Sequence, residues 1–410
     1  MDAIIERCCG LDVHQASIVA CLLKTTDKGR PKREIRKFGT TTDELTKLRE
    51  WLESEGCTHV GMESTGVYWM PVYSVLEGAF ELIVGNAAHI KNVPGRKTDV
   101  KDAEWIADLV RHGLIRRSFV PPKWQRDLRD LVRYRRKLVE TQASERNRLM
   151  KMLEIGNIKL SSVASNVFGV SGRAMLRALI EGKSTPLEMA RLARGTMKQK
   201  IGDLTRALDG RLQPHHRALL RVQLARVERT EEDVDTVDKL IKQQLAPHAE
   251  VIAKLVEIPG VEWIGAVEIV AEMGLDMSVF PTAKHAAAWA GVCPGNSESA
   301  GKNLGSAKRK GNVHLTTALV QAAAAAARKK GSYLKDKYWR IRSKRGHKRA
   351  LVAVAHQILN IIYVMLRDGI DYSDLGEGYL DKRNGDAAKN RLIRRLEAMG
   401  YAVEVKPAAA

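Results

Sequence analysis

The sequence predicts an α/β domain at the N-terminus, followed by a remainder that is almost wholly helical. Within residues 1–90, short apolar or alternating runs take turns with helical patterns, which is typical of a layered α/β domain. From Lys97 onward, long charged segments carry apolar residues at heptad-like spacing, as paired antiparallel helices do. At 410 residues the chain exceeds what one small core organises, so two or three domains are expected.

The N-terminal elements follow a recognisable order. Three strands come first, then a helix that Thr42 can cap, a strand, a second helix and a final strand. The expected strands are 7–13, 17–23, 33–38, 59–62 and 82–84, and the helices run through Leu45–Leu52 and Tyr68–Leu76. Three strands followed by helix, strand, helix and strand is the order of an RNase H-like domain, which we place at residues 1–125.

The rest of the chain divides into two helical parts. Residues 126–250 form the helical or coiled-coil region, because 123–155 and 213–250 are long and heptad-like, and an antiparallel arm of this kind is expected to mediate self-association. Residues 251–410 form the C-terminal domain. It contains a helix-hairpin-helix candidate around Pro259-Gly260, which could contact a phosphate or only pack. Glu262, near the start of the second helix, weighs against phosphate contact.

Composition narrows the class of partner. The chain carries 68 Lys and Arg against 48 Asp and Glu, a net charge of +20, which favours a polyanion, most plausibly nucleic acid. Aromatic residues are only 5%, so gripping single strands mainly by base stacking is not expected. We expect no membrane span and no signal peptide. The five scattered cysteines are typical of reduced, mostly buried thiols in a cytoplasmic protein. We expect this protein to be associated with the nucleoid.

Two segments concentrate the positive charge. One is a helical face with Arg126, Arg129 and Arg133, which is either a solvated surface or a nucleic-acid contact. The other is 301–350, with fifteen Lys or Arg and one acid. So much unbalanced charge would repel itself without a partner. The residues of this segment expected to bind nucleic acid are Lys302, Lys308, Arg309, Lys310, Arg345, Lys348 and Arg349.

Four acids stand at element ends in the N-terminal part. Asp12 and Glu63 each end an apolar strand, while Asp99 and Asp102 lie three residues apart at a helix start. In an RNase H-like sheet the strands of Asp12 and Glu63 are neighbours. Four carboxylates in one pocket need cations to stay ionised, and two Mg²⁺ ions suit a phosphodiester substrate. Taken singly, each acid could instead be a strand end or a helix cap.

Ser299 lies in a loop rich in Pro, Gly, Asn and Ser, over 290–302, that runs directly into the basic segment. Its composition alone is that of an ordinary turn. A nucleophilic serine needs an activating base or metal and cations to hold the phosphate. The cations are present locally, but a base is not, so an activator would have to come from another domain or subunit.

Several motifs in register make the chain resemble, from end to end, the DEDD transposases of the insertion-sequence one-ten family, relatives of the Piv-type DNA invertases. The first motif runs from Gly10 through Asp12 to His14, and the second from Met62 through Glu63 to Trp69. The remaining motifs are 94–103, 290–302 and 309–312.

The resemblance implies a Holliday-junction-resolvase-like RNase H domain with Asp12, Glu63, Asp99 and Asp102 as catalytic metal ligands. It also implies a coiled-coil arm and a C-terminal transposase domain in which Ser299 forms a phosphoserine link to DNA. Ser297 is only two residues away, so the choice of Ser299 rests on the family register. Further implied features are a bridge RNA that pairs with target and donor DNA, and a metal site supplied by a partner subunit of a dimer or tetramer.

Three functions therefore stay open at this point. The first is a recombinase that moves an insertion sequence, acting on double-stranded element ends and target DNA with Mg²⁺ and Ser299. The second is a metal-dependent, structure-selective nuclease or junction resolvase without a serine nucleophile. The third is a non-catalytic nucleic-acid-binding scaffold whose acids are structural.

Overall fold

The structure is a computed structural model that describes residues 4–25, 31–93, 102–293, 297–299, 302–305, 311–383 and 385–404. It contains two compact units, Met1–Pro121 and Pro122–Ala410. The division falls four residues before the expected limit at residue 125.

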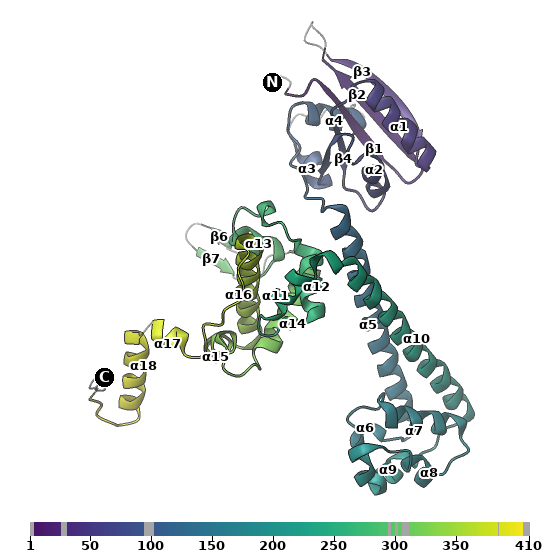
Figure 1. Cartoon of the computed structure of the whole chain (residues 1–410), viewed down its shortest axis with the longest axis vertical. Helices are drawn as coiled ribbons and strands as arrows, with labels where there is room; N and C mark the ends of the chain where they lie inside the picture. Colours follow the sequence, from purple (N-terminus) through teal and green to yellow (C-terminus); the bar gives the residue numbers. More distant parts are fainter. Residues whose placement is uncertain are drawn as a thin grey trace. The chain divides into compact units, whose positions relative to one another are not determined.

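The N-terminal unit is built on a five-stranded mixed sheet (Figure 1). The strands are β1 (Arg7–Val13), β2 (Ser17–Lys24), β3 (Lys32–Gly39), β4 (His59–Glu63) and β5 (Glu81–Gly85). Their order across the sheet is β3-β2-β1-β4-β5. Strands β1, β2 and β3 pair antiparallel, whereas β4 runs parallel to β1 and β5 parallel to β4. The expected succession of strands and helices is confirmed.

Helices cover both faces of this sheet. Alternate residues of β1 point to opposite faces: Cys9 and Leu11 pack with α1 (Thr42–Ser54) and α2 (Trp69–Leu76), while Cys8 packs with α4 (Asp102–Arg111). The short α3 (Ala87–Asn92) adds Ile90 to the α4 side. Because β1 is central and buried on both faces, it reads as a continuous apolar run.

Two long helices form an arm in the second unit, α5 (Lys123–Ile155) and α10 (Pro214–Gln244) (Figure 1). Arg135 pairs with Asp238, and Arg146 further along α5 pairs with Glu231 earlier on α10. The two helices are therefore antiparallel. Between them in sequence lie α6 (Leu160–Val163), α7 (Val170–Glu181), α8 (Pro186–Ala190) and α9 (Ile201–Leu208), which form their own core with Leu149 and Leu153.

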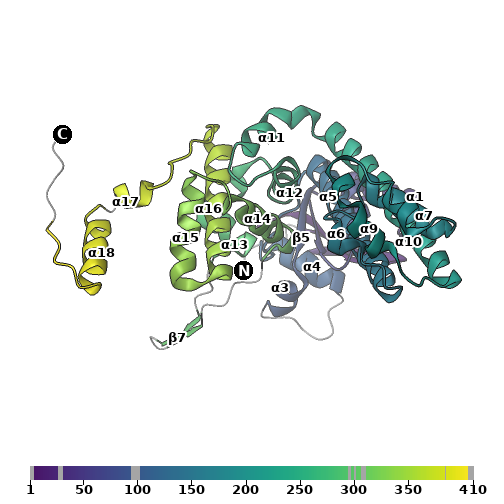
Figure 2. The ribbon, with the colours of Figure 1, turned by 90° about the horizontal axis from the view of Figure 1, so that it is seen from below.

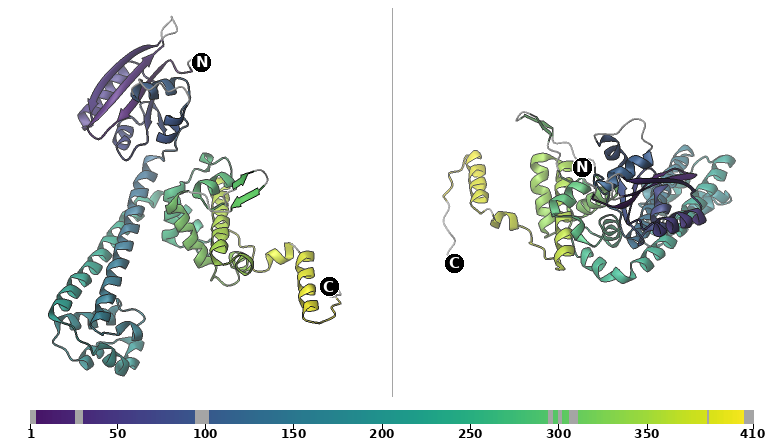
Figure 3. Two further views of the ribbon diagram at one scale, coloured as in Figure 1. Left: turned by 180° about the vertical axis from the view of Figure 1, so that it is seen from behind. Right: turned by 90° about the horizontal axis from the view of Figure 1, so that it is seen from above.

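The C-terminal helices pack around a single large core that also takes in the base of the arm, through Leu128 and Ile241. They are α11 (Ala249–Val256), α12 (Trp263–Met273), α13 (Ala283–Ala290), α14 (Val313–Ala326), α15 (Tyr333–Arg345) and α16 (His347–Asp368), followed by α17 (Tyr379–Arg383) and α18 (Gly385–Ala398). Figure 2 shows α15 and α16 side by side. Between α13 and α14, the strands β6 (Ser297–Ser299) and β7 (Lys302–Gly305) form a hairpin that protrudes from the helices (Figure 3).

Helix α16 is, within the described part of the chain, the one helix whose length and composition would allow it to cross a membrane. Its residues Val354, Ala355, Ile358 and Leu359 are completely buried in the C-terminal core. Packing against α13, α14 and α15 accounts for its apolar character.

Candidate functional site

Helix α4 lies directly on the backbone of β1 and β4. A Cβ atom at Gly10 would lie 2.3 Å from the carbonyl oxygen of Ala103 and 2.2 Å from the amide nitrogen of Ala107. A Cβ atom at Gly61 would lie 2.3 Å from the side chain of Val110. Only glycine fits so close an approach, so these two glycines mark the face of the sheet that α4 covers.

Asp12 and Glu63 project from this same face. Each lies two residues beyond one of the marker glycines, and side chains two apart along a strand share a face. The register pairs Leu11 with Met62 on adjacent parallel strands, so Asp12 and Glu63 occupy the next positions at one edge. Asp102 is the first residue of α4, directly before Ala103, which sits over Gly10. The fold therefore brings three of the four predicted acids to one edge and one face.

Asp12 and Glu63 each contact a polar side chain two residues further along the chain. The Asp12 side chain is 26% exposed, and its Oδ2 lies 3.2 Å from Nε2 of His14. The Thr65 hydroxyl donates a hydrogen bond to Oε1 of Glu63, and Asp102 is exposed. Asp99 lies outside the described residues. Within those residues, no group of three or more His, Cys, Asp or Glu side chains is close enough to hold a metal ion.

Ser299 ends strand β6 of the protruding hairpin. It pairs with Lys302 of β7, while Ser297 pairs with Gly305 across a register shift. The segment predicted as a loop thus contains a short β-hairpin that places Ser299 and Lys302 next to its turn. Lys308, Arg309 and Lys310 lie outside the described residues.

Two glycines, Gly291 and Gly311, lie close together at the two ends of the segment that carries this hairpin. A Cβ atom on Gly311 would lie 2.4 Å from the amide nitrogen of Gly291, and Gly291 itself ends α13 with a φ of 69°. The amide of Asn312 donates to the carbonyl of Trp289 at 3.1 Å, and the Thr316 hydroxyl donates to the carbonyl of Ala290 at 2.6 Å. The two ends of the serine-bearing segment are therefore fixed to each other.

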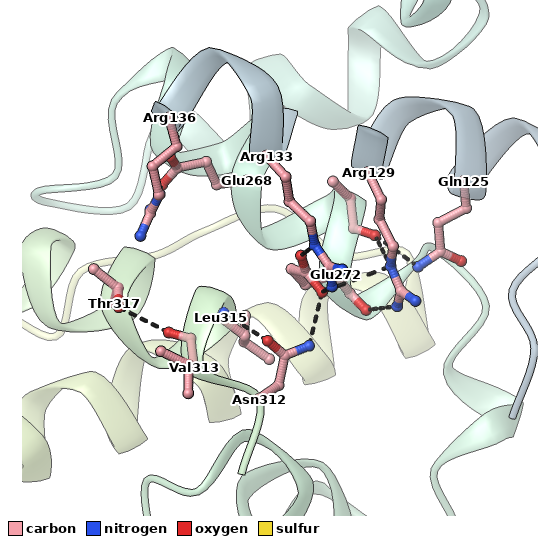
Figure 4. Close-up of polar contacts among 11 residues, drawn as sticks. Gln125, Arg129, Arg133, Arg136, Glu268, Glu272, Asn312, Val313, Leu315 and Thr317 are labelled. Carbon is pink, nitrogen blue, oxygen red and sulfur yellow. Dashed lines mark hydrogen bonds and ion pairs between the residues drawn. The ribbon is translucent and has the colours of Figure 1, made fainter. Parts of the chain in front are cut away.

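A buried carboxylate ties one end of this segment to the long helix α5. Glu272 is 1% exposed, and Figure 4 shows Arg129, Arg133 and Asn312 converging on it. Arg133 donates two hydrogen bonds to its carboxylate at 2.8 and 2.9 Å, and Asn312 Nδ2 donates a third at 2.7 Å. Burial by itself would raise the pKa of Glu272, but the bonds from Arg133 and Asn312 and the nearby charges lower it below its ordinary value.

The basic face of α5 is largely engaged within the protein. Arg129 donates to the carbonyl of Ala271 at 2.7 Å and lies 3.6 Å from the Glu272 carboxylate, and Arg136 pairs with Glu268 at 2.7 Å. Arg133 keeps 43% of its side chain exposed. The structure thus gives Arg129 and Arg133 a role in holding α12, while nucleic-acid binding by them and by Arg126 stays a prediction. By contrast, Arg345, Lys348 and Arg349 are exposed at the α15–α16 junction.

The hairpin Pro259-Gly260 joins α11 to α12, as expected. Gly260 has a φ of 86°, and a Cβ atom there would lie 2.2 Å from the carbonyl of Ala322 on α14. This turn therefore packs into the core of the C-terminal helices. Glu262, the residue before α12, is exposed and makes no side-chain cap.

Two family models match this chain. A DEDD transposase model of the IS110 type, described as a transposase, matches residues 9–157. A second, described as "Transposase IS116/IS110/IS902 family", matches residues 252–339. The chain belongs to the IS110 family of transposases. No curated protein matches it significantly.

Family membership identifies the chain as an enzyme that acts on DNA, cutting and rejoining it. The first match spans the edge that carries Asp12, Glu63 and Asp102, and the second spans the hairpin of Ser299 and the buried Glu272. Sequence reasoning on this transposase missed Glu272. Its signal was present: Glu268 and Glu272 are the two acids in the helical stretch Trp263–Met273, whose other residues are apolar or small, and an acid on such a helix calls for a partner when it is buried.

Proposed function

We propose that this IS110-family transposase cuts and rejoins the strands of an insertion sequence with two groups that lie far apart in its sequence. One group is the four acids Asp12, Glu63, Asp99 and Asp102, and the other is Ser299 with its neighbouring cations. The observation that carries the proposal is that the fold places Asp12, Glu63 and Asp102 at one edge and on one face of the sheet. A strand end or helix cap taken alone would not require that shared placement.

Mg²⁺ is the cofactor that suits these acids, because it takes hard oxygen ligands and keeps several waters. Asp12, Glu63 and Asp102 would hold it together with Asp99. When bound, such ions stabilise the charge on the attacking and leaving oxygens of a phosphodiester. The mixed sheet with order β3-β2-β1-β4-β5 is the basis on which we assign the N-terminal unit to the RNase H-like class.

Ser299 is proposed as the nucleophile. Its hydroxyl oxygen would form a bond to the DNA phosphorus while the bond to a deoxyribose oxygen breaks, leaving DNA attached as a phosphoserine. Lys302 lies opposite Ser299 in the hairpin, and Lys308, Arg309 and Lys310 follow it in sequence. Such cations stabilise the negative charge that develops on the phosphate in the transition state.

The test is the covalent adduct itself. Incubation of the protein with end-labelled element DNA and Mg²⁺, followed by digestion and mass spectrometry, should place a nucleotide on Ser299. Ser299→Ala should abolish the adduct, while the matched variant Ser297→Ala should retain it. An adduct that survives Ser299→Ala contradicts the role of this serine.

The nuclease alternative has one structural observation in its favour. The three acids belong to a unit with its own cores, separate from the serine hairpin, so cleavage could proceed without the serine. In that case Ser299→Ala would cleave DNA at the wild-type rate, whereas Asp102→Asn would not cleave it.

A guide RNA and self-association complete the proposal. The two cationic regions suit two nucleic acids. Extraction and sequencing of RNA that co-purifies with the protein from the cytoplasm tests for a guide RNA.

The antiparallel arm of α5 and α10 is a candidate coiled coil for a dimer or tetramer. Light scattering on the full chain tests for self-association.

A further inference from the structure

Trp339 is exposed on a strongly cationic part of the C-terminal unit. It is 49% exposed, and the other six of the seven tryptophans, all within the described residues, are buried or half-buried. Tryptophan is costly to leave in water. An exposed indole on a charged helix is therefore a candidate contact for a partner.

The ring is held in a defined position. The guanidinium carbon of Arg342 lies 4.5 Å from the Trp339 ring centre, and the Tyr338 ring meets it edge-on at 5.5 Å. Tyr338 is buried, and its hydroxyl lies 2.7 Å from Nδ1 of His347 on the next helix. These neighbours support the indole, while about half of its surface stays open to solvent.

The cations around Trp339 lack acidic partners. Five exposed cations lie from here to the start of α16, and none of them has a carboxylate of the described residues within 4.0 Å; they are Arg342, Lys344, Arg345, Lys348 and Arg349. Two other cations of α15 do have acidic partners. Lys335 pairs with Glu377 at 3.9 Å, and Arg340 pairs with Asp336 at 2.8 Å. These five cations therefore leave positive potential unbalanced beside the exposed Trp339.

The turn between α15 and α16 brings these cations close together. Gly346 adopts a φ of 80°, which favours glycine, and it ends α15 one residue before α16 begins. Helices α15 and α16 then lie side by side (Figure 2). The last turn of one helix and the first turn of the other therefore present their cations together.

We propose that Trp339 and these five cations form a site for an unpaired nucleotide. The base stacks on the open part of the indole and the flanking phosphates contact the cations, which is the combination that proteins use to hold single strands. In a fully paired duplex the base faces are covered by their neighbours, so Trp339 would gain nothing there. This inference rests on the proposed action on nucleic acid, and it adds that this site binds an unpaired strand rather than a paired one.

The experiment compares full-length variants on fluorescein-labelled oligonucleotides by anisotropy. The probes are a fully paired duplex and the same duplex with a short unpaired tract that contains 2-aminopurine, each prepared as DNA and as RNA. Trp339→Ala should weaken binding to the unpaired-tract probe roughly 5- to 150-fold, the effect of losing one stacked base. Binding to the paired duplex should change less than about twofold, and Trp339→Phe should retain part of the preference. The type of probe that shows the effect, DNA or RNA, identifies the kind of strand that the site binds.

Controls separate stacking from charge and from folding. Tyr401→Ala removes another exposed aromatic side chain and should change neither probe, whereas Arg345→Ala should weaken both probes and lower the salt slope by about one. The inference is overturned if a folded Trp339→Ala or Trp339→Leu variant binds the unpaired-tract probe as tightly as wild type does, both as DNA and as RNA. If the wild type binds neither probe, the proposed function itself fails.

Discussion

At Glu272 of α12 a single carboxylate binds residues from two other segments, Arg129 and Arg133 of α5 and Asn312 at the end of the serine-bearing segment. Its side chain is 2% exposed. Removing one partner of such a buried pair leaves the other charge uncompensated. We expect Glu272→Ala to lower the free energy of unfolding by about 3 kcal/mol, measured by urea denaturation. The exposed pair of Asp203 with Arg206 provides the control, since Asp203→Asn should cost no more than about 0.5 kcal/mol.

The pH dependence of this network has a definite sign. The pKa of Glu272 is lowered in the folded state, so its stabilising contribution is present at neutral pH and is lost as the pH falls below the ordinary value near 4.5. The difference in unfolding free energy between wild type and Glu272→Gln should therefore shrink on acidification through that range. A difference that grows instead would show that the carboxylate is not held in its charged form.

The cysteines are expected to differ sharply in reactivity. Burial raises the pKa of Cys8 and Cys57 to about 12 and that of Cys21 to about 11, and it raises the pKa of Cys9 well above 9.0. The thiolate is the reactive form, so these four should resist alkylation of the native protein at pH 8, whereas half-buried Cys293 should react. Mass spectrometry before and after denaturation in urea checks this expectation. Labelling of the native protein should vanish in Cys293→Ser. Modification of Cys57 in the native protein would contradict the expectation that the buried thiols are unreactive.

At the scale of elements, the contact between β1 and α4 decides where Asp102 lies. Because a Cβ atom at Gly10 would overlap the backbone of α4, Gly10→Ala should push this helix away from the sheet. The expected cost is about 1–3 kcal/mol, as for other overpacked sites, with a larger loss of DNA cleavage than of DNA binding.

Gly39→Ala is the matched control for that variant. A Cβ atom there would meet only the flexible side chain of Glu44, at 3.2 Å, so stability and cleavage should stay close to wild type. If Gly10→Ala cleaves DNA as fast as wild type, α4 does not position a catalytic acid.

The elements themselves were largely predictable from sequence. The strands β1, β2, β4 and β5 are short apolar runs between polar turns, and α5 begins and ends at the predicted residues 123 and 155. What a helix faces was not predictable. Spacing puts Arg129 and Arg133 on one face of α5, but only the fold shows that this face meets Glu272. The closing contact of Gly311 with Gly291 depends on backbone proximity across a long segment, which no local pattern reports.

At the scale of the whole molecule, the acids and the serine belong to different compact units, Met1–Pro121 and Pro122–Ala410. The order of acids along the chain was readable because each follows a strand end or opens a helix. Whether the acids act on the same phosphate as Ser299, and from which copy of the chain, could not be predicted, because a pattern within one chain does not report which copy supplies each part. If the arm mediates the self-association proposed above, a site shared between subunits is the expected arrangement.

Mixing two inactive variants tests that arrangement. Asp102→Asn lacks an acid and Ser299→Ala lacks the proposed nucleophile, so each should be inactive alone in strand joining. If one subunit supplies the acids and its partner the serine, a mixed oligomer contains one intact site, and co-refolded or co-expressed variants should regain strand joining and the covalent adduct. Mixing Asp102→Asn with Asp12→Asn is the control, because both defects lie in the same unit and no intact site can form. Equal inactivity of both mixtures would place the acids and the serine of each site in the same chain.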